Sequence, residues 1–277
     1  MTVSTFAAAQ ILRFVPRVRL SRAVGRLCEL QLHPMVADTA SRIYAKAYGV
    51  NLGEVEPGQA PYSSFDAFFT RRLRSGARSI DRARVTSPAD GKIVAAGKIT
   101  SNAEIFVKGR PYDVAELCGY AGAAALYNGG QFAVVYLHPR DYHRVHAPVA
   151  GEIRKIRSMG GDLFPVNAIG EQHVPRLFVR NQRVNIEISS PTLGTVAVVM
   201  VGATIVGRIT TVAMGGDRTP VGEHVINPAQ PVNQGDEIGT FHLGSTAVLL
   251  LPPSSGVVLS TGTGPVLYGE SLEGSHA

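Results

Sequence analysis

After Ile80 the sequence changes to short apolar runs separated by glycine and proline, and this pattern continues to the C-terminus. Short apolar runs between turn residues are typical of β-strands, because helices need longer periodic segments. Residues 87–93 and 146–153 look like two copies of one element, in which a proline is followed by a turn glycine and then by a strand. Asp236 and Gly256 lie in similar settings. Most of the chain is therefore predicted to be β-structure.

Helical patterns near the N-terminus together with the repeated Pro-x-x-Gly-x-Ile hairpins after them predict an α+β fold. N-terminal helices would precede a β-rich sandwich or barrel that resembles the half-barrels of lipoyl and biotinyl domains. A carrier domain of that kind holds a lysine at an exposed hairpin tip, and no lysine here has that setting. We expect a helical region over residues 1–76 and a β-rich domain over residues 77–277.

The N-terminal region is predicted to contain amphipathic helices. Residues 21–48 have a helical pattern, and the apolar positions on one face are Leu20, Val24 and Leu27. Five arginines lie beside or just before this face: Arg13, Arg17, Arg19, Arg22 and Arg26. Such a segment suits a helix lying on anionic lipid headgroups, and the alternative is a surface helix packed on its own domain. A further helix is expected to begin after Ser64, a typical cap, and to end at Gly76.

The net charge indicates which class of partner the protein binds, and the cysteine content indicates its redox compartment. The chain of 277 residues has a net charge of +6, which suits an anionic partner such as nucleic acid or an anionic membrane. Cys28 and Cys118 form no metal or redox motif, so we expect free thiols in a reducing compartment. The longest apolar stretch, residues 196–207, is too short and too interrupted to cross a bilayer and reads as a buried strand. Residues 6–12 do not fit a signal peptide, so we expect the protein in the cytoplasm or on a membrane facing it.

Three histidines lie close together in the stretch from residue 138 to residue 148. His143 and His146 are three positions apart, which lets both serve one site, and an imidazole can move protons near neutral pH. Zinc is the rival interpretation, but this His-x-x-His pair lacks a third ligand at the usual spacing, so no metal is expected. A structural role for each histidine remains the alternative.

Asp90 and Ser245 are the natural partners of His146. Asp90 lies in the first of the two similar turns and His146 in the second, and equivalent positions of a pseudo-symmetric sandwich come close in space. Asp90 could then orient His146, and His146 could deprotonate Ser245, as in serine proteases. Because Gly244 precedes Ser245 and has no side chain to obstruct its carbonyl, the serine could attack its own peptide bond. The alternative is that both motifs are structural, because Gly-Ser-Thr triplets and Asp-Gly pairs are common in turns.

The motifs of the chain follow one another in a specific order. They are residues 68–73 (Phe-Phe-Thr-Arg-Arg-Leu), 76–78 (Gly-Ala-Arg), 87–91 (Ser-Pro-Ala-Asp-Gly), 107–109, 117–119, 141–148 (Asp-Tyr-His-Arg-Val-His-Ala-Pro), 181–183, 201–203 and 235–246, which ends in Leu-Gly-Ser-Thr. Over most of its length the chain resembles the bacterial type of phosphatidylserine decarboxylase.

The resemblance implies a self-processing proenzyme. Cleavage between Gly244 and Ser245 would give a β chain of residues 1–244 and an α chain of residues 245–277, and residue 245 would become a covalent pyruvoyl group. Asp90, His146 and Ser245 would form the self-cleavage triad. The pyruvoyl ketone would form a Schiff base with phosphatidylserine, and His143 would act in decarboxylation as the proton donor that yields phosphatidylethanolamine.

The resemblance also implies where the enzyme works and what it contacts. We expect a peripheral protein on the cytoplasmic side of the cell membrane, bound to an anionic lipid surface through its N-terminal region, without nucleic acid. The α and β chains would stay together, and a homodimer is a further expectation. Two other readings stay open: a serine hydrolase that uses Asp90, His146 and Ser245 on an external ester, and a non-catalytic lipoyl-like module that binds membranes.

Overall fold

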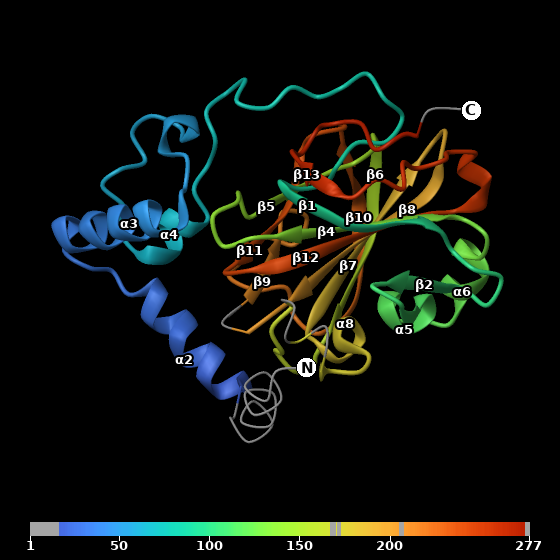
Figure 1. Cartoon of the computed structure of the whole chain (residues 1–277), viewed down its shortest axis with the longest axis horizontal. Coiled ribbons are helices and arrows are strands. Elements are labelled where there is room, and N and C mark those ends of the chain that lie inside the picture. Colours follow the sequence, from blue (N-terminus) through green and yellow to red (C-terminus); the bar gives the residue numbers. More distant parts are fainter. Residues whose placement is uncertain (1–16, 167–169, 171–172, 205–207, 275–277) are drawn as a thin grey trace.

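The computed structural model describes residues 17–166, 170, 173–204 and 208–274, and its fold is α+β (Figure 1). Helices α2 (Arg17–Glu29), α3 (Pro34–Tyr48) and α4 (Phe65–Phe69) come first, with a short 3-10 helix, η1 (Leu52–Glu54), before α4. They lie to one side of the strands that make up most of the remaining chain (Figure 1). The α+β prediction is confirmed, whereas the division into two domains at residue 76 stays a prediction.

The predicted helices are present but shorter than expected. The helical pattern of residues 21–48 is interrupted between α2 and α3, because Pro34 has no N–H to continue a helix and instead occupies the first turn of α3. Ser64 caps α4 as predicted, and its Oγ accepts a hydrogen bond from the Ala67 N–H at 3.1 Å. Helix α4 nevertheless ends at Phe69 rather than at Gly76, since Leu73 forms an antiparallel bridge with Val55. The predicted contribution of Arg13 lies outside the described residues.

The strands form a large antiparallel sheet with the order β10-β6-β7-β8-β12-β4-β1-β13. Their bounds are β10 (Gly222–Val232), β6 (Gly151–Met159), β7 (Arg183–Ser190), β8 (Gly194–Gly202), β12 (Ser245–Leu251), β4 (Gln131–Leu137), β1 (Gly91–Lys98) and β13 (Gly264–Val266), and a 3-10 helix, η2 (Pro253–Ser255), lies between β12 and β13. As predicted, a strand begins at each turn glycine, β1 at Gly91 and β6 at Gly151. The predicted barrel is wrong for the described chain, because β10 and β13 are the edges of an open sheet. The likeness to lipoyl domains stays a prediction.

Both faces of this sheet are buried, which explains the continuous apolar runs of its central strands. In β12, Ala247 and Leu249 belong to one core, whereas Val248 and Leu250 belong to the other, because successive side chains of a strand point to opposite faces. Strand β8 follows the same rule, so residues 196–202 are the buried strand that the sequence predicts, and residues 205–207 of that prediction lie outside the described chain.

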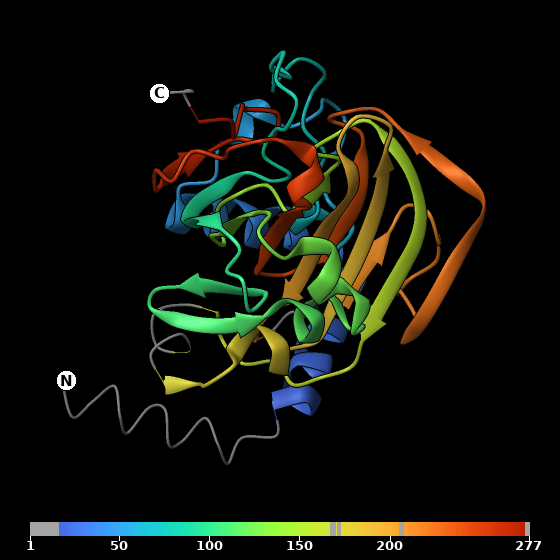
Figure 2. The same cartoon turned by 90° about the vertical axis from the view of Figure 1, so that its right-hand side faces the viewer.

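Two smaller layers cover the two faces of the large sheet. One face is covered by the hairpin β2 (Glu104–Val107) and β3 (Arg110–Asp113) with the short helices α5 (Val114–Cys118), α6 (Gly122–Tyr127) and α8 (Leu177–Arg180) (Figure 2). The other face packs against a three-stranded sheet of β5 (Arg144–His146), β11 (Glu237–His242) and β9 (Arg208–Thr211). The core that contains Ala247 and Leu249 therefore lies between two sheets.

The chain passes between these two sheets at adjacent places. One connection, residues 138–143, joins β4 to β5, and the other, residues 243–244, joins β11 to β12. Strands β4 and β12 pair in the large sheet, and β5 and β11 pair in the small one. The two connections are consequently neighbours, and one carries His143 while the other carries the Gly244–Ser245 bond.

Candidate active site

The two similar turns of the sequence lie side by side. The His146 N–H donates to the Pro88 carbonyl at 2.7 Å, and the Thr86 N–H donates to the Pro148 carbonyl at 3.0 Å. Close approach explains the glycine after Asp90, because a Cβ built on Gly91 would lie 2.3 Å from the Tyr136 carbonyl oxygen on β4. The structure thus brings the Asp90 turn and the His146 turn together, as their equivalent positions in the sequence predict.

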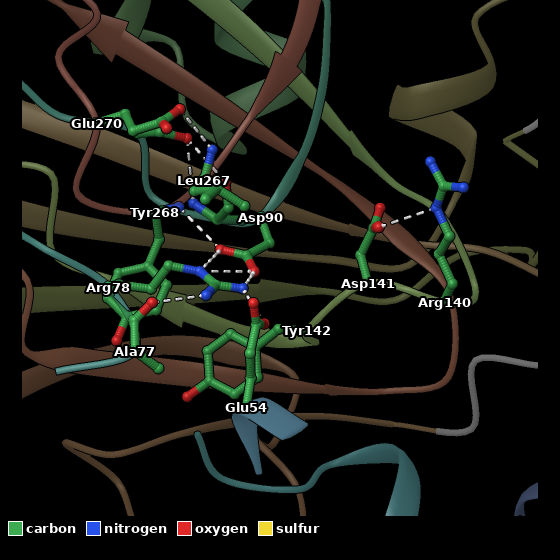
Figure 3. A network of polar contacts seen from close by, with 12 residues as sticks. Glu54, Ala77, Arg78, Asp90, Arg140, Asp141, Tyr142, Leu267, Tyr268 and Glu270 are labelled. Atoms are coloured by element: carbon green, nitrogen blue, oxygen red, sulfur yellow. Dashed lines mark hydrogen bonds and ion pairs between the residues drawn. The ribbon is translucent and has the colours of Figure 1, made fainter. Parts of the chain in front are cut away.

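The carboxylate of Asp90 is held by Arg78 (Figure 3). Nη2 of Arg78 donates to Oδ2 of Asp90 at 2.6 Å and also to Oε2 of Glu54 at 2.8 Å. The backbone N–H of Tyr268 donates to Oδ1 of Asp90 at 2.9 Å. Both partners of the ion pair are buried, with 6% and 5% of their side chains exposed, so the carboxylate of Asp90 lies against a guanidinium inside the protein.

His146 lies next to this pair and has partners of its own. Its Nδ1 lies 2.7 Å from the Gly235 carbonyl oxygen, which can only accept, so Nδ1 carries the proton. Its Nε2 then accepts from the Tyr142 hydroxyl at 3.3 Å. The ring of Tyr268 stacks on the imidazole, with centroids 3.8 Å apart, so Asp90 and His146 share Tyr268 as a neighbour. Burial lowers the pKa of His146 and keeps the ring neutral.

His143 lies on the same connection but points into a different environment. It is fully buried and stacks on Phe69 of α4, with ring centroids 4.1 Å apart. Neither ring nitrogen has a partner with full hydrogen-bond geometry, although the backbone of His138 and Pro139 lies close enough to favour the protonated ring. Burial, together with the nearby guanidinium of Arg71, lowers the pKa of His143 to about 3, so the imidazole is neutral at physiological pH.

Ser245 is the first residue of β12 and is held on both sides by the large sheet. It pairs with Leu137 at the end of β4 and with Gly202 at the end of β8. Its side chain is buried, and its Oγ has no hydrogen-bond partner. Before it, Gly244 is uncrowded, since a Cβ built there would meet no heavy atom within 4 Å. The hydroxyl is therefore not engaged in any structural bond that an attack on the neighbouring carbonyl would have to break.

Strand β11 contacts His143 through the backbone, because the Phe241 N–H donates to the His143 carbonyl at 2.9 Å. The structure consequently places His143 near the strand that leads to Ser245, and Asp90 near His146. A direct contact between Asp90 and His146, or between His146 and Ser245, is not among these bonds, and the triad stays a prediction.

Several polar residues at the site carry no role in the sequence interpretation. Arg71 is buried, its Nη2 donates to the carbonyls of Arg140 and Asp141, and its Nε and Nη1 have no partner. Together with Arg78, Asp90, Asp141 and Tyr142, it lines a cavity of about 500 Å³. Arg71, Arg78 and Tyr142 all lie in motifs that the sequence contains, but no spacing rule joins them to Asp90 or His146.

Within the described ranges, His, Cys, Asp and Glu side chains do not gather in a group of three or more that could bind a metal ion. None of the described helices is both long and apolar enough to cross a membrane. Cys28 and Cys118 are free thiols, as predicted.

Comparisons with known proteins identify a family for this chain. The family model described as phosphatidylserine decarboxylase matches residues 65–273. A protein of Psychrobacter cryohalolentis is 41% identical over 246 residues, which cover 88% of each chain. A protein of Methylobacillus flagellatus is 40% identical over 268 residues, which cover 93% of this chain and 95% of the relative. A protein of Marinobacter nauticus is 38% identical, with 86% of each chain covered. All three relatives are named phosphatidylserine decarboxylase proenzyme.

Proposed function

The chain belongs to the phosphatidylserine decarboxylase family, and from this membership we propose that it cuts itself and then decarboxylates phosphatidylserine to phosphatidylethanolamine. The observation that supports this most directly is the state of Ser245, a buried hydroxyl without a partner, immediately after the uncrowded Gly244. A buried polar atom without a hydrogen bond costs free energy, and a catalytic role is one reason for a protein to keep it. The products would be a β chain of residues 1–244 and an α chain of residues 245–277.

We propose that His146 is the base of the cleavage step. Its Nδ1 proton is held by the Gly235 carbonyl, which leaves Nε2 as the basic nitrogen of a neutral ring. The ring is fixed on one side by stacking on Tyr268. Asp90 would stabilise the imidazolium that forms when Nε2 takes the Ser245 proton, and Arg78 holds the Asp90 carboxylate in place for that purpose.

Residue 245 fits the pyruvoyl group that the proposal requires, because its unpartnered hydroxyl and the open position before it leave the serine free to react. A pyruvoyl group, once formed, supplies an electron-poor ketone that accepts the electrons released as carbon dioxide leaves. The protein must then move a proton to the substrate carbon. We assign this step to His143, whose two ring nitrogens have no structural partners to give up. Since its ring is neutral in the uncleaved chain, it would take up the proton when the anionic substrate lies beside it.

The surface of the N-terminal helices supports the proposal that the enzyme acts at a membrane surface. Helix α3 buries its small residues Ala37, Ser41 and Ala45 against the protein. Large apolar side chains of α2, α3 and the segment between them are exposed: Leu20, Leu27, Leu30, Met35, Val36 and Ile43. Exposed apolar side chains on a basic segment suit the headgroup region of an anionic bilayer, so we propose a peripheral protein on the cytoplasmic side. Sedimentation with anionic vesicles but not with zwitterionic ones is the expected result, and equal binding to both would contradict it.

Intact mass of the purified protein tests the proposed function. Wild-type protein should give two chains, and the chain that begins at residue 245 should lack a free amine and gain mass with borohydride as a ketone does. Ser245→Ala should remain one full-length, folded chain, because the lost Oγ has no hydrogen bond. A folded wild-type protein that stays in one piece would refute the proposal. Two chains without a ketone would point to a hydrolytic serine enzyme instead.

A further inference from the structure

Leu243 has a backbone conformation that is unusual for its residue type. Its φ angle is +85°, in the left-handed region that glycine adopts freely and branched side chains avoid. The residue is buried and comes directly before Gly244, so the strain lies one residue from the bond that the proposed function requires to break. Residues held in such a conformation persist only when the surrounding structure imposes it.

The structure shows what holds each end of this short segment. After it, Ser245 is fixed by strand pairing with β4 and β8. Before it, the side chain of His242 is fixed by α4, because Nδ1 of His242 lies 2.9 Å from both carboxylate oxygens of Asp66. The hydroxyl of Thr210 on β9 lies 3.2 Å from Nε2 of the same ring. The two residues between these anchors, Leu243 and Gly244, have to join β11 to β12 across a fixed gap.

Asp66 is suited to act as a firm anchor. It is buried, and Nη2 of Arg208 donates to its Oδ2 at 3.1 Å. Although burial raises the pKa of Asp66, the hydrogen bond from His242 and the charges of His242 and Arg208 outweigh it, so the pKa lies below its ordinary value. Nε of Arg208 also lies 3.3 Å from Glu29 at the end of α2. The carboxylate therefore stays ionised at physiological pH and joins the helices to the end of β11.

We propose that Asp66 and His242 are positioning residues for self-cleavage, which hold the end of β11 so that Leu243 stays strained until the Gly244–Ser245 bond breaks. This inference rests on the proposed function, since it concerns the same bond. Neither residue belongs to the predicted triad, and neither touches the reacting atoms. On this proposal their effect passes through the backbone of Leu243.

The first step of the cleavage explains how the strain would be used. The Oγ of Ser245 forms a bond to the Gly244 carbonyl carbon, the bond from that carbon to the Ser245 nitrogen breaks, and the hydroxyl proton ends on the nitrogen. The path from the carbonyl carbon to the Ser245 Cα then runs through oxygen and Cβ instead of through nitrogen alone, so it is one atom longer. The longer link lets the segment between the anchors relax, and strain present in the peptide but reduced in the ester favours the reaction.

Two variants test the two parts of this inference. Leu243→Gly keeps the turn but makes its φ angle unstrained, and it should slow self-cleavage about tenfold, the scale expected from one strained residue. Asp66→Asn weakens the anchor and should slow cleavage in the same direction. Asp38→Asn, which removes an exposed ion pair on α3 instead, is the matched control and should cleave at the wild-type rate. Precursor made by cell-free synthesis is followed by intact mass from the moment of synthesis.

Combining the variants separates strain from a general loss of structure. If Asp66 acts through Leu243, then Asp66→Asn should add nothing in the Leu243→Gly background. Slowing factors that multiply in the double variant would overturn the inference, and so would wild-type cleavage by Leu243→Gly. Thermal unfolding in the Ser245→Ala background should show that Leu243→Gly is folded. A wild-type chain that never cleaves would refute the proposed function itself, which is a different outcome from these.

Discussion

The buried polar groups of the site fall into a paired set and an unpaired set. The paired set is Arg78, Asp90, Tyr142, His146 and Tyr268, in which the carboxylate and both nitrogens of the imidazole have partners. The unpaired set is Arg71, His143 and Ser245, each of which has at least one buried polar atom without a hydrogen bond. The two sets lie on neighbouring turns and connections, and they differ in whether their polar atoms have partners.

The difference indicates a division of tasks. Paired groups fix geometry before any reaction, since each hydrogen bond limits the rotation of a ring or a carboxylate. Unpaired groups cost stability in the uncleaved chain and gain partners only when something else arrives. Substitutions should therefore affect stability most in the paired set and chemistry most in the unpaired set.

The largest effect is expected for His143→Ala. Self-cleavage should proceed normally, because His146 serves as its base, while the decarboxylation rate per cleaved chain should fall by about 10²–10⁴-fold, the usual contribution of a positioned proton donor. The rate is measured as carbon dioxide release from phosphatidylserine in mixed micelles, with chain content determined by intact mass. His138→Ala, a half-buried histidine of the same connection, is the control and should retain activity. Loss of cleavage in His143→Ala would contradict the division between the two histidines.

The next effect is on stability, in the paired set. Arg78→Ala leaves the carboxylate of Asp90 buried without its cation, and the free energy of unfolding should fall by about 3 kcal/mol. Urea unfolding in the Ser245→Ala background measures this loss without interference from cleavage. Arg42→Ala removes an exposed ion pair with Asp38 and should leave the unfolding midpoint unchanged. If Arg78→Ala behaved like that control, the pair would not fix Asp90.

The sequence predicts those features that depend on local pattern. The strands that follow Asp90 and Pro148, the cap at Ser64 and the pairing of the two similar turns are examples, because turn chemistry and strand periodicity are local. The predicted end of α4 at Gly76 is wrong, because Leu73 forms a bridge with Val55, and this tertiary contact overrides the helical pattern. The prediction of a closed barrel is wrong for a similar reason. Repeated hairpins indicate how many strands form, but they do not determine whether the two edge strands of the sheet pair with each other.

The contacts between residues of the site could not be predicted from local sequence patterns. Arg78 reaches Asp90 from 12 residues upstream, and the N–H of Tyr268 reaches it from 178 residues downstream. Asp66 and His242, which hold the strained Leu243, are 176 residues apart. Without the fold, nothing in the spacing of these residues distinguishes them from other charged or aromatic residues of the chain.

The smallest expected effect is a pH-dependent loss of folding stability caused by His143, a member of the unpaired set. The folded chain holds the pKa of His143 at about 3, whereas its ordinary value is 6.5. Between these values the unfolded chain binds a proton that the folded chain does not, so stability falls as the pH falls, and above 6.5 this contribution vanishes. At pH 5.5 one such histidine should lower the free energy of unfolding by about 1 kcal/mol relative to pH 7.5.

Substituting the histidine should remove this cost. In the Ser245→Ala background, His143→Gln should lose about 1 kcal/mol less between pH 7.5 and pH 5.5 than its parent does. His146, whose pKa is also lowered, is present in both proteins and cancels in the difference. His33→Gln, at an exposed histidine before α3, should leave the loss unchanged. An equal loss with and without His143 would mean that its ring is not held neutral by burial. A smaller loss would show that burying the neutral ring of His143 carries a measurable cost in the uncleaved chain.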